Sequence, residues 1–172
     1  GKGKVNKLDF HNVKEKNVIV KEIKVANHIC ESIKKSVSSR MPSPPYTTST
    51  LQQDASRILN FSSSKTMKVA QSLYEGINIG RGSQTGLITY MRTDSTRLSD
   101  EACSAAQSYI LSQYGKEYHK KNNYAQKKSK NAQDAHEAIR PVNININPSQ
   151  ISKYLSQDEL KLYRLIWQRF LM

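Results

Sequence analysis

The stretch Gly86-Leu87-Ile88-Thr89-Tyr90-Met91-Arg92-Thr93-Asp94-Ser95 begins with apolar residues and then turns abruptly polar. An apolar run of this length predicts a short strand over Leu87–Tyr90 that ends at the phenol. A tyrosine hydroxyl is a poor nucleophile unless neighbouring positive charge stabilises the phenolate. Arg92 can supply that charge, or it can hold a phosphate through its planar set of N–H donors. The stretch therefore predicts a polar site at the end of a buried segment.

The composition indicates a polyanionic partner. The chain has 172 residues and a formal net charge of +13, from 27 Lys and Arg against 14 Asp and Glu. Such an excess favours nucleic acid through the release of counterions, although a merely basic protein would show the same charge. Taken with the opening stretch, it leads to the hypothesis that Tyr90 attacks a DNA phosphodiester.

The cysteines and the apolar runs exclude several classes of protein. Cys30 and Cys103 are the two cysteines and do not form a Cys-x-x-Cys pair, which argues against a structural zinc site or a disulfide framework and favours an intracellular setting. No apolar run approaches the about 20 residues of a membrane span. The chain starts without methionine and stops inside an apolar helical pattern, so we expect it to be a piece of a longer protein.

The N-terminal region carries no recognisable chemistry. Residues Val18–Val25 predict a strand, and the apolar spacing from Ala26 to Val37 predicts a short amphipathic helix after it. His11 and His28 are isolated and are interpreted as surface or packing residues. The closely spaced prolines that begin at Pro42 force extended backbone and mark a boundary.

A pair of helices is predicted after this boundary. The hydroxyl run Thr47–Thr50 offers caps for a first helix, with contact to a phosphate as the alternative reading. The serines Ser62–Ser64 precede a second helix over Lys65–Glu75, which Gly76 can end. Two helices joined by a short polar turn are typical of a helix-turn-helix-like unit.

Further along the chain, Ser99 predicts the cap of a helix that ends near Gly115. The lysine-rich segment Lys116–Lys130 contains Tyr118 and Tyr124. Such a segment is either a solvated loop or a nucleic-acid contact, and the sequence leaves both open.

A second dense polar cluster covers Gln133–Pro141. If the cluster is helical, His136 and Arg140 lie four residues apart on one face. Together they could hold a phosphate, and the histidine could also move a proton. A capping box at Ser156 predicts a last helix, in which Trp167 is expected to be a core residue.

Together these stretches resemble the bacterial type IA DNA topoisomerases. The matching stretches are Pro44–Gln53, Ala70–Gly76, Gly86–Ser95, Ala135–Pro141 and Leu165–Phe170. The resemblance is close from about Pro42 to Met172. Over residues 1–41 it is loose, and that region looks like part of a β-rich arch domain. The order and spacing of the motifs make the resemblance specific, whereas any one of them alone would be weak.

The resemblance implies a role for each residue of the site. Tyr90 would cleave one DNA strand and keep its 5′ phosphoryl end as a phosphotyrosine. Arg92 would position the scissile phosphate and stabilise its developing charge, and His136 would contact DNA near the cleavage site. Asp94 would help to order the site. Supporting roles fall to Gln71, Glu75 and Thr89. Arg140 also matches the family, either as a DNA contact or as a brace.

The resemblance also implies a missing half of the site. Family members use a Toprim domain that supplies a general-acid glutamate and a paired-aspartate Mg²⁺ site, and this chain has no Asp-x-Asp. We therefore expect no metal ligand here and no relaxation of supercoiled DNA by the chain alone. The expected partners are single-stranded DNA and the Toprim domain of the same protein, in the bacterial cytoplasm at the nucleoid.

The expected fold is α+β and mainly α. Residues 42–148 would form a helical, winged-helix-like catalytic domain, flanked by an arch piece over 1–41 and a helical return over 149–172. The family analogy adds a swinging motion that opens a gate for the second strand. A non-catalytic helix-turn-helix module is the alternative function, but it gives no reason for the residues around Tyr90. A tyrosine recombinase is rejected, because its His-x-x-Arg precedes the nucleophile, whereas His136 follows Tyr90 and is separated from Arg140 by three residues.

Overall fold

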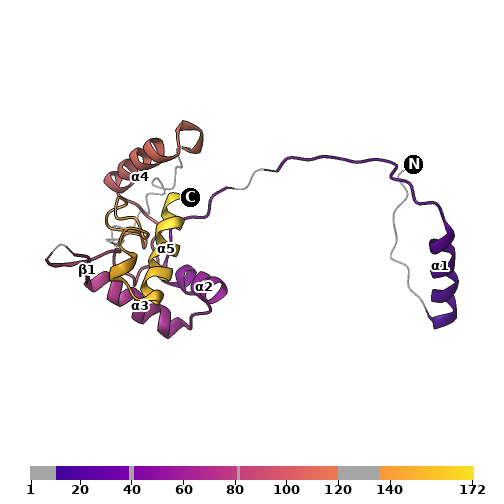
Figure 1. The fold of residues 1–172 in the computed structure, drawn as a ribbon, viewed down its shortest axis with the longest axis horizontal. Helices are drawn as coiled ribbons and strands as arrows, with labels where there is room; N and C mark the ends of the chain where they lie inside the picture. Colours follow the sequence, from indigo (N-terminus) through magenta and orange to yellow (C-terminus); the bar gives the residue numbers. More distant parts are fainter. Residues whose placement is uncertain (1–10, 39–40, 81, 120–135) are drawn as a thin grey trace. The chain divides into compact units, whose positions relative to one another are not determined.

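The computed structural model describes residues 11–38, 41–80, 82–119 and 136–172. The chain divides into two compact units, Gly1–Arg40 and Met41–Met172, and each is described by itself (Figure 1). The expected division into arch pieces and a catalytic domain stays a prediction.

The first unit contains helix α1, Val13–Val25, so the strand predicted over Val18–Val25 is wrong. The side chain of Asn12 caps this helix by accepting a hydrogen bond from the backbone N–H of Glu15. None of the helix's side chains is buried. The helix predicted from Ala26 to Val37 is also wrong, because no regular secondary structure follows α1 within residues 27–38.

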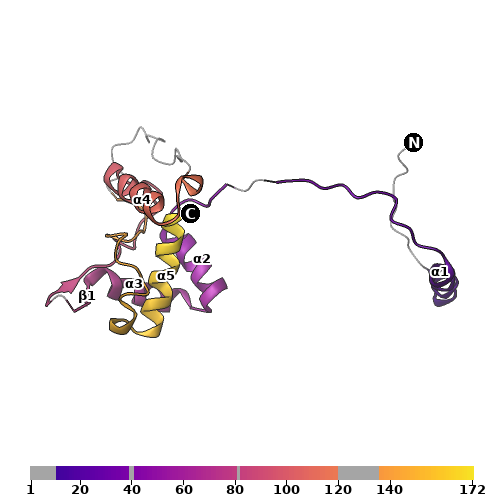
Figure 2. The same cartoon turned by 45° about the horizontal axis from the view of Figure 1, so that its top comes forward.

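The second unit is mainly helical, which confirms the predicted fold class. Its elements are α2 (Thr48–Leu59), α3 (Ser63–Glu75), β1 (Ile77–Asn78), β2 (Gln84–Thr85), α4 (Asp100–Gln113), η1 (Lys116–Tyr118), η3 (Ser152–Tyr154) and α5 (Gln157–Leu171). The two short strands form an antiparallel hairpin after α3 (Figure 2). Among the described residues, no helix is long and apolar enough to cross a membrane.

Side-chain caps begin these helices where the sequence predicts them. Thr47 and Thr50 form a reciprocal capping box at α2. Ser62, Ser99 and Ser156 each accept a backbone N–H at the starts of α3, α4 and α5. Each such cap contributes about 1 kcal/mol, because it satisfies a donor that the helix leaves unpaired.

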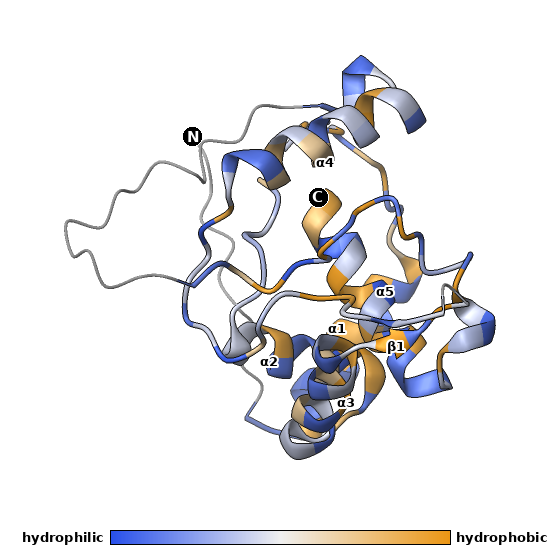
Figure 3. Cartoon of the chain, turned by 90° about the vertical axis from the view of Figure 1, so that its left-hand side faces the viewer, coloured by the Kyte–Doolittle hydropathy of each residue, from blue (hydrophilic) through white to orange (hydrophobic). Residues whose placement is uncertain are grey.

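The core lies where α3 and α5 pack against each other and α2 packs against both. Helix α5 is amphipathic, with hydrophobic and hydrophilic residues alternating along its ribbon (Figure 3). Its Trp167 is buried, as predicted, and donates an indole hydrogen bond to the carbonyl of Ile144 at 3.0 Å. Tyr163 donates to the carbonyl of Ile146 at 2.8 Å. These bonds join the irregular segment after residue 141 to the last helix.

Two segments without regular secondary structure replace elements that the sequence predicts differently. Residues 87–90 form no strand, and only Ile88 makes a bridge, with Pro141. Residues 136–140 are extended, so the predicted helix is wrong over the described part of the Gln133–Pro141 cluster. Ile139 forms a second antiparallel bridge, with Tyr46. The segment before Pro141 therefore lies between the entry to α2 and the stretch that leads to Tyr90.

A polar cluster ties the entry segment to α5. Arg169 donates to the carbonyl of Pro44 at 2.8 Å and pairs with Asp54 at 3.1 Å, and its guanidinium lies 4.5 Å from the Tyr46 ring centre. Tyr46 donates its hydroxyl hydrogen bond to Asp54 at 2.7 Å. Burial and this bond raise the pKa of Tyr46, so the phenol stays protonated. The cluster fixes Tyr46, whose backbone in turn holds the segment of Ile139.

Candidate functional site

The site is built on the stretch from Gly86 to Ser95, which begins against the end of α3. Leu87 donates its backbone N–H to the carbonyl of Leu73 at 2.8 Å. A Cβ at position 86 would lie 2.9 Å from the carbonyl oxygen of Tyr74. Glycine is therefore required for this close approach, because real Cβ atoms do not come so near to backbone.

Exposure alternates along the second half of this stretch. Met91, Thr93 and Ser95 are buried. Tyr90, Arg92 and Asp94 alternate with them and are exposed. The alternation places the phenol, the guanidinium and the carboxylate on the solvent side of one anchored loop. These three polar side chains therefore share one side of the loop, and their role as a site stays a prediction.

Thr48, in the first turn of α2, holds this loop in place. Its hydroxyl donates to the carbonyl of Met91 at 2.7 Å and accepts the N–H of Thr93 at 2.9 Å, and its own N–H donates to the carbonyl of Thr93 at 2.9 Å. The sequence interpretation favoured capping for the hydroxyl run Thr47–Thr50, with contact to a phosphate as the alternative. Capping is correct for Thr47 and Thr50, but the interpretation missed Thr48, and no local sequence signal separates an anchoring hydroxyl from a capping one.

His136 reaches Tyr90 from a distant part of the chain. The two ring centres are 5.7 Å apart, with a tilt of 39° between the rings. Thr89 joins the two segments: its hydroxyl donates to the carbonyl of Ala138 at 2.7 Å and accepts the N–H of Arg140 at 3.0 Å. Its backbone N–H donates to the carbonyl of Arg140 at 2.9 Å. Thr89 therefore positions the histidine beside the phenol.

Helix α3 contributes a further aromatic ring. Tyr74 is 40% exposed, and its ring meets that of Tyr90 edge-on, with the ring centres 5.3 Å apart. The sequence interpretation did not single out Tyr74 as a site residue, so it missed this contact. The available sequence signal was the position of Tyr74 between Gln71 and Glu75. In the structure, the side chains of Gln71 and Glu75 hydrogen-bond to each other, one helical turn apart.

Arg140 is engaged within the fold. Its Nε donates to the carboxylate of Glu137 at 2.9 Å, and its Nη1 donates to the carbonyl of Pro141 at 3.0 Å. Burial acts to raise the pKa of Glu137, but hydrogen bonds from Ser99 and Arg140 hold that pKa below its usual range. Because residues 136–140 are not helical, the predicted common helical face of His136 and Arg140 is absent. Arg140 braces the extended segment that carries the histidine.

Arg92 and Asp94 make no hydrogen bond or ion pair with any other residue that the structure describes. An exposed arginine without an internal partner can offer its N–H donors to a phosphate. Over the described ranges, no group of three or more His, Cys, Asp or Glu side chains could hold a metal ion. The described side chains around Tyr90 therefore do not fit a magnesium site.

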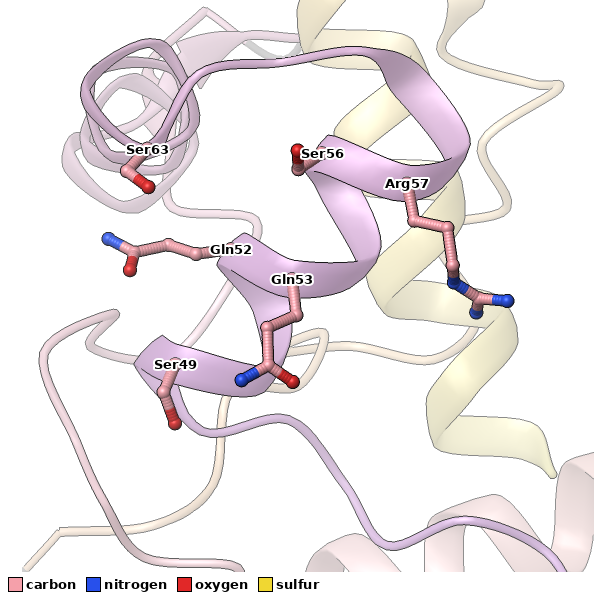
Figure 4. A pocket seen from close by; sticks show the side chains of 6 residues that line it. All are labelled: Ser49, Gln52, Gln53, Ser56, Arg57 and Ser63. Carbon is pink, nitrogen blue, oxygen red and sulfur yellow. The ribbon is translucent and has the colours of Figure 1, made fainter.

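An open polar groove runs along α2 and has a volume of about 460 Å³. Its lining residues are Ser49, Gln52, Gln53, Ser56, Arg57 and Ser63 (Figure 4). The guanidinium of Arg57 pairs with Asp54 at 2.8 Å and is otherwise largely exposed. Hydroxyls and amides of this kind can make hydrogen bonds, but the groove contains none of the residues around Tyr90.

The role of Thr48 gives a first prediction. Thr48→Val keeps the side-chain shape but leaves the carbonyl of Met91 and the N–H of Thr93 without their partner. We expect the free energy of unfolding to fall by about 1–3 kcal/mol, because buried polar groups that lose a partner retain their desolvation cost. Urea denaturation measures the change. The matched control is Ser56→Ala, which removes an exposed hydroxyl from the same helix and should cost less than about 0.5 kcal/mol. Equal losses in the two variants would contradict the anchoring role.

Comparisons with known proteins cover nearly the whole chain. A family model described as DNA topoisomerase matches residues 2–172. The proteins named DNA topoisomerase 1 of Rickettsia typhi and Rickettsia prowazekii are each 46% identical to the chain over 167 residues. The alignment covers 96% of this chain and 21% of each relative. The chain thus spans about a fifth of the length of these curated relatives.

A solved structure of full-length topoisomerase I from Thermotoga maritima is also similar. Its TM-score against this chain is 0.78 at 42% sequence identity. The match covers 97% of this chain and 26% of that one. Fold and sequence therefore agree on the same group of relatives.

Proposed function

The chain belongs to the DNA topoisomerase family, and from this premise we propose that it carries the strand-cleaving tyrosine of a type IA enzyme. The observation that carries the proposal is the surrounding of Tyr90. Its ring is 38% exposed, touches the ring of His136, and shares one side of an anchored loop with Arg92 and Asp94. The net charge of +13 suits a DNA substrate.

The proposed reaction is a reversible transesterification. The Tyr90 phenol loses its proton as its oxygen attacks a backbone phosphorus of one DNA strand. The attack displaces the 3′ oxygen, which takes up a proton and leaves as a 3′-hydroxyl. The phosphoryl group stays on the tyrosine as a 5′-phosphotyrosine. One phosphodiester replaces another of similar energy, so religation by the reverse attack needs no ATP. Repeated cleavage and religation would relax negatively supercoiled DNA.

The other site residues assist in this proposal. Arg92 holds the scissile phosphate and stabilises its developing charge. His136 contacts DNA near the cleavage site, and Asp94 orders the loop. Gln71 and Glu75 support the site from α3. Thr89 joins the two segments that carry Tyr90 and His136.

We further propose that the rest of the active site lies in a Toprim domain of the same protein. That domain would supply the general acid and bind Mg²⁺, which would contribute charge stabilisation at the cleavage site. The preferred substrate is single-stranded DNA, in the bacterial cytoplasm at the nucleoid. Movement of the tyrosine-bearing domain away from the other parts would open a gate for the passing strand.

Covalent capture of labelled oligonucleotides tests the proposal. The chain is mixed with a separately made Toprim-containing piece and Mg²⁺, and adducts are resolved by denaturing gel electrophoresis. A 3′-labelled single strand should become attached to the chain, whereas a 5′-labelled one should release its label with the 3′-hydroxyl product. The chain alone should form no adduct and should not relax supercoiled plasmid. Capture of the 5′ label would reverse the proposed polarity, and relaxation by the chain alone would contradict the missing half-site.

A further inference from the structure

A series of tyrosine rings leads from the core to the surface at the end of α4. Tyr109 meets Trp167 edge-on, with the ring centres 5.7 Å apart. Tyr114 follows at 6.4 Å from Tyr109, and Tyr118 at 6.3 Å from Tyr114. Trp167 is a buried residue with a hydrogen-bonded indole, so the inner end of this tyrosine series is fixed.

Exposure increases along the series. Tyr109 is half-buried, Tyr114 is 49% exposed and Tyr118 is 69% exposed. Helix α4 buries only small residues, Ala102 and Ala106, so its aromatic end is not needed to fill the core. Neighbouring aromatic rings that are exposed and held in position are the usual basis of a stacking platform for bases.

The surrounding charge favours a polyanion. Lys116 lies between Tyr114 and Tyr118 in the sequence and is exposed, and Glu117 is the one acidic residue within the described range 114–119. The sequence that follows, residues 120–130, contains five lysines and no acidic residue. These are Lys120, Lys121, Lys127, Lys128 and Lys130. Residues 120–130 lie outside the part of the chain that the structure describes, so their charge is counted from the sequence alone.

We propose that Tyr114 and Tyr118, with Lys116 beside them, form a stacking site for the unpaired bases of single-stranded DNA. The choice of DNA rests on the proposed function, and the site lies on a different element from the Tyr90 loop. A duplex keeps its base faces stacked internally, so exposed tyrosine rings can bind bases only from a single strand. Stacking is tolerant of sequence, because every base has a π-face.

Equilibrium binding tests this site without involving the cleavage chemistry. All variants are made in a Tyr90→Phe background, and fluorescence anisotropy measures the Kd for a labelled oligothymidylate of about 16 nucleotides. We expect Tyr118→Ala to raise the Kd about five- to tenfold, at the lower end of measured base–tyrosine stacking. Tyr118→Phe keeps the ring and should keep the Kd within about twofold.

The matched control is Tyr154→Ala. Tyr154 is 36% exposed and has the Lys153 ammonium 4.9 Å from its ring centre, but it lies outside the tyrosine series. Its replacement should leave the Kd unchanged. Thermal unfolding checks that each variant is folded, as expected for Tyr118 in view of its exposure.

Several outcomes would overturn the stacking site. These are an unchanged Kd in Tyr118→Ala, an equal loss in Tyr118→Phe, an equal loss for duplex DNA, or no binding by the parent chain. The binding assay is independent of covalent capture. Failure of capture with a Tyr118-dependent Kd would therefore count against the proposed function alone, and the reverse result would count against the stacking site alone.

Discussion

Replacing Tyr90 with phenylalanine is expected to abolish covalent capture of DNA in the reconstituted mixture, a loss of at least about 10³-fold. The substitution removes the attacking oxygen and keeps the ring that contacts Tyr74 and His136. The phenol makes no hydrogen bond within the described residues and is partly exposed, so the free energy of unfolding should change by less than about 0.5 kcal/mol. The readout is the yield of adduct with a 3′-labelled single strand.

Tyr74 provides the control, because it is the other exposed phenol at the site. Tyr74→Phe removes a phenol oxygen from a ring whose centre lies 5.3 Å from that of Tyr90. This variant should leave the adduct yield within about threefold of the parent. Loss of the adduct in Tyr74→Phe with its retention in Tyr90→Phe would transfer the nucleophile to Tyr74. An unchanged adduct yield in both variants would show that neither phenol is the nucleophile.

The helix starts of the second unit were predictable because their signals are local. A serine or threonine that accepts a backbone N–H in the next turn needs no information from elsewhere in the chain. Thr47, Ser62, Ser99 and Ser156 all follow this rule. The burial of Trp167 was predictable for a similar reason, since it lies on the apolar face of a helix with a clear repeat.

The extended conformation of the His136 segment was not predictable from local sequence. Its backbone hydrogen bonds come from Arg97, Tyr46 and Thr89, which are distant in the sequence. The four-residue separation of His136 and Arg140 in the sequence does not by itself distinguish a helix from an extended chain. The proline that follows disfavours a helical conformation at Arg140. The motif resemblance implies that His136 contacts DNA near the cleavage site, and this role stays a prediction. The structure places the His136 ring beside the ring of Tyr90.

The strand prediction for residues 18–25 was wrong for a different reason. Their β-branched residues favour a strand by propensity, but short apolar runs do not separate strand from helix. The cap at Asn12 lies upstream of the run that was read as a strand. No side chain of α1 is buried. Without a buried face, packing does not impose on the sequence an apolar repeat of helical period that would reveal the helix.

The alternation along the loop after Tyr90 explains why single residues can be tested there. Met91, Thr93 and Ser95 hold the loop from its buried side, and Thr48 fixes two of their backbone positions. Arg92 and Asp94, the exposed residues between them, do not pack in the core. A substitution at Arg92 therefore changes the chemistry offered to a phosphate with little effect on the loop itself.

Arg92→Ala is accordingly expected to lower the rate of adduct formation by about 10²–10³-fold while leaving the free energy of unfolding nearly unchanged. The guanidinium has no partner among the described residues, so its removal leaves no buried group unsatisfied. Arg92→Lys should recover only part of the rate, because an ammonium supplies charge without the planar pair of donors that fits a phosphate. Single-turnover capture of a 3′-labelled strand at saturating DNA measures the rate apart from binding.

Arg57→Ala is the matched control for charge. It removes one positive charge from an arginine whose side chain is 73% exposed, and its partner Asp54 keeps a second ion pair with Arg169. General loss of attraction for DNA would slow both variants equally and would vanish at saturating DNA. A selective loss in Arg92→Ala that persists at saturation assigns the guanidinium to the transition state of cleavage. Equal rates in the two variants would instead reduce Arg92 to one surface charge among many.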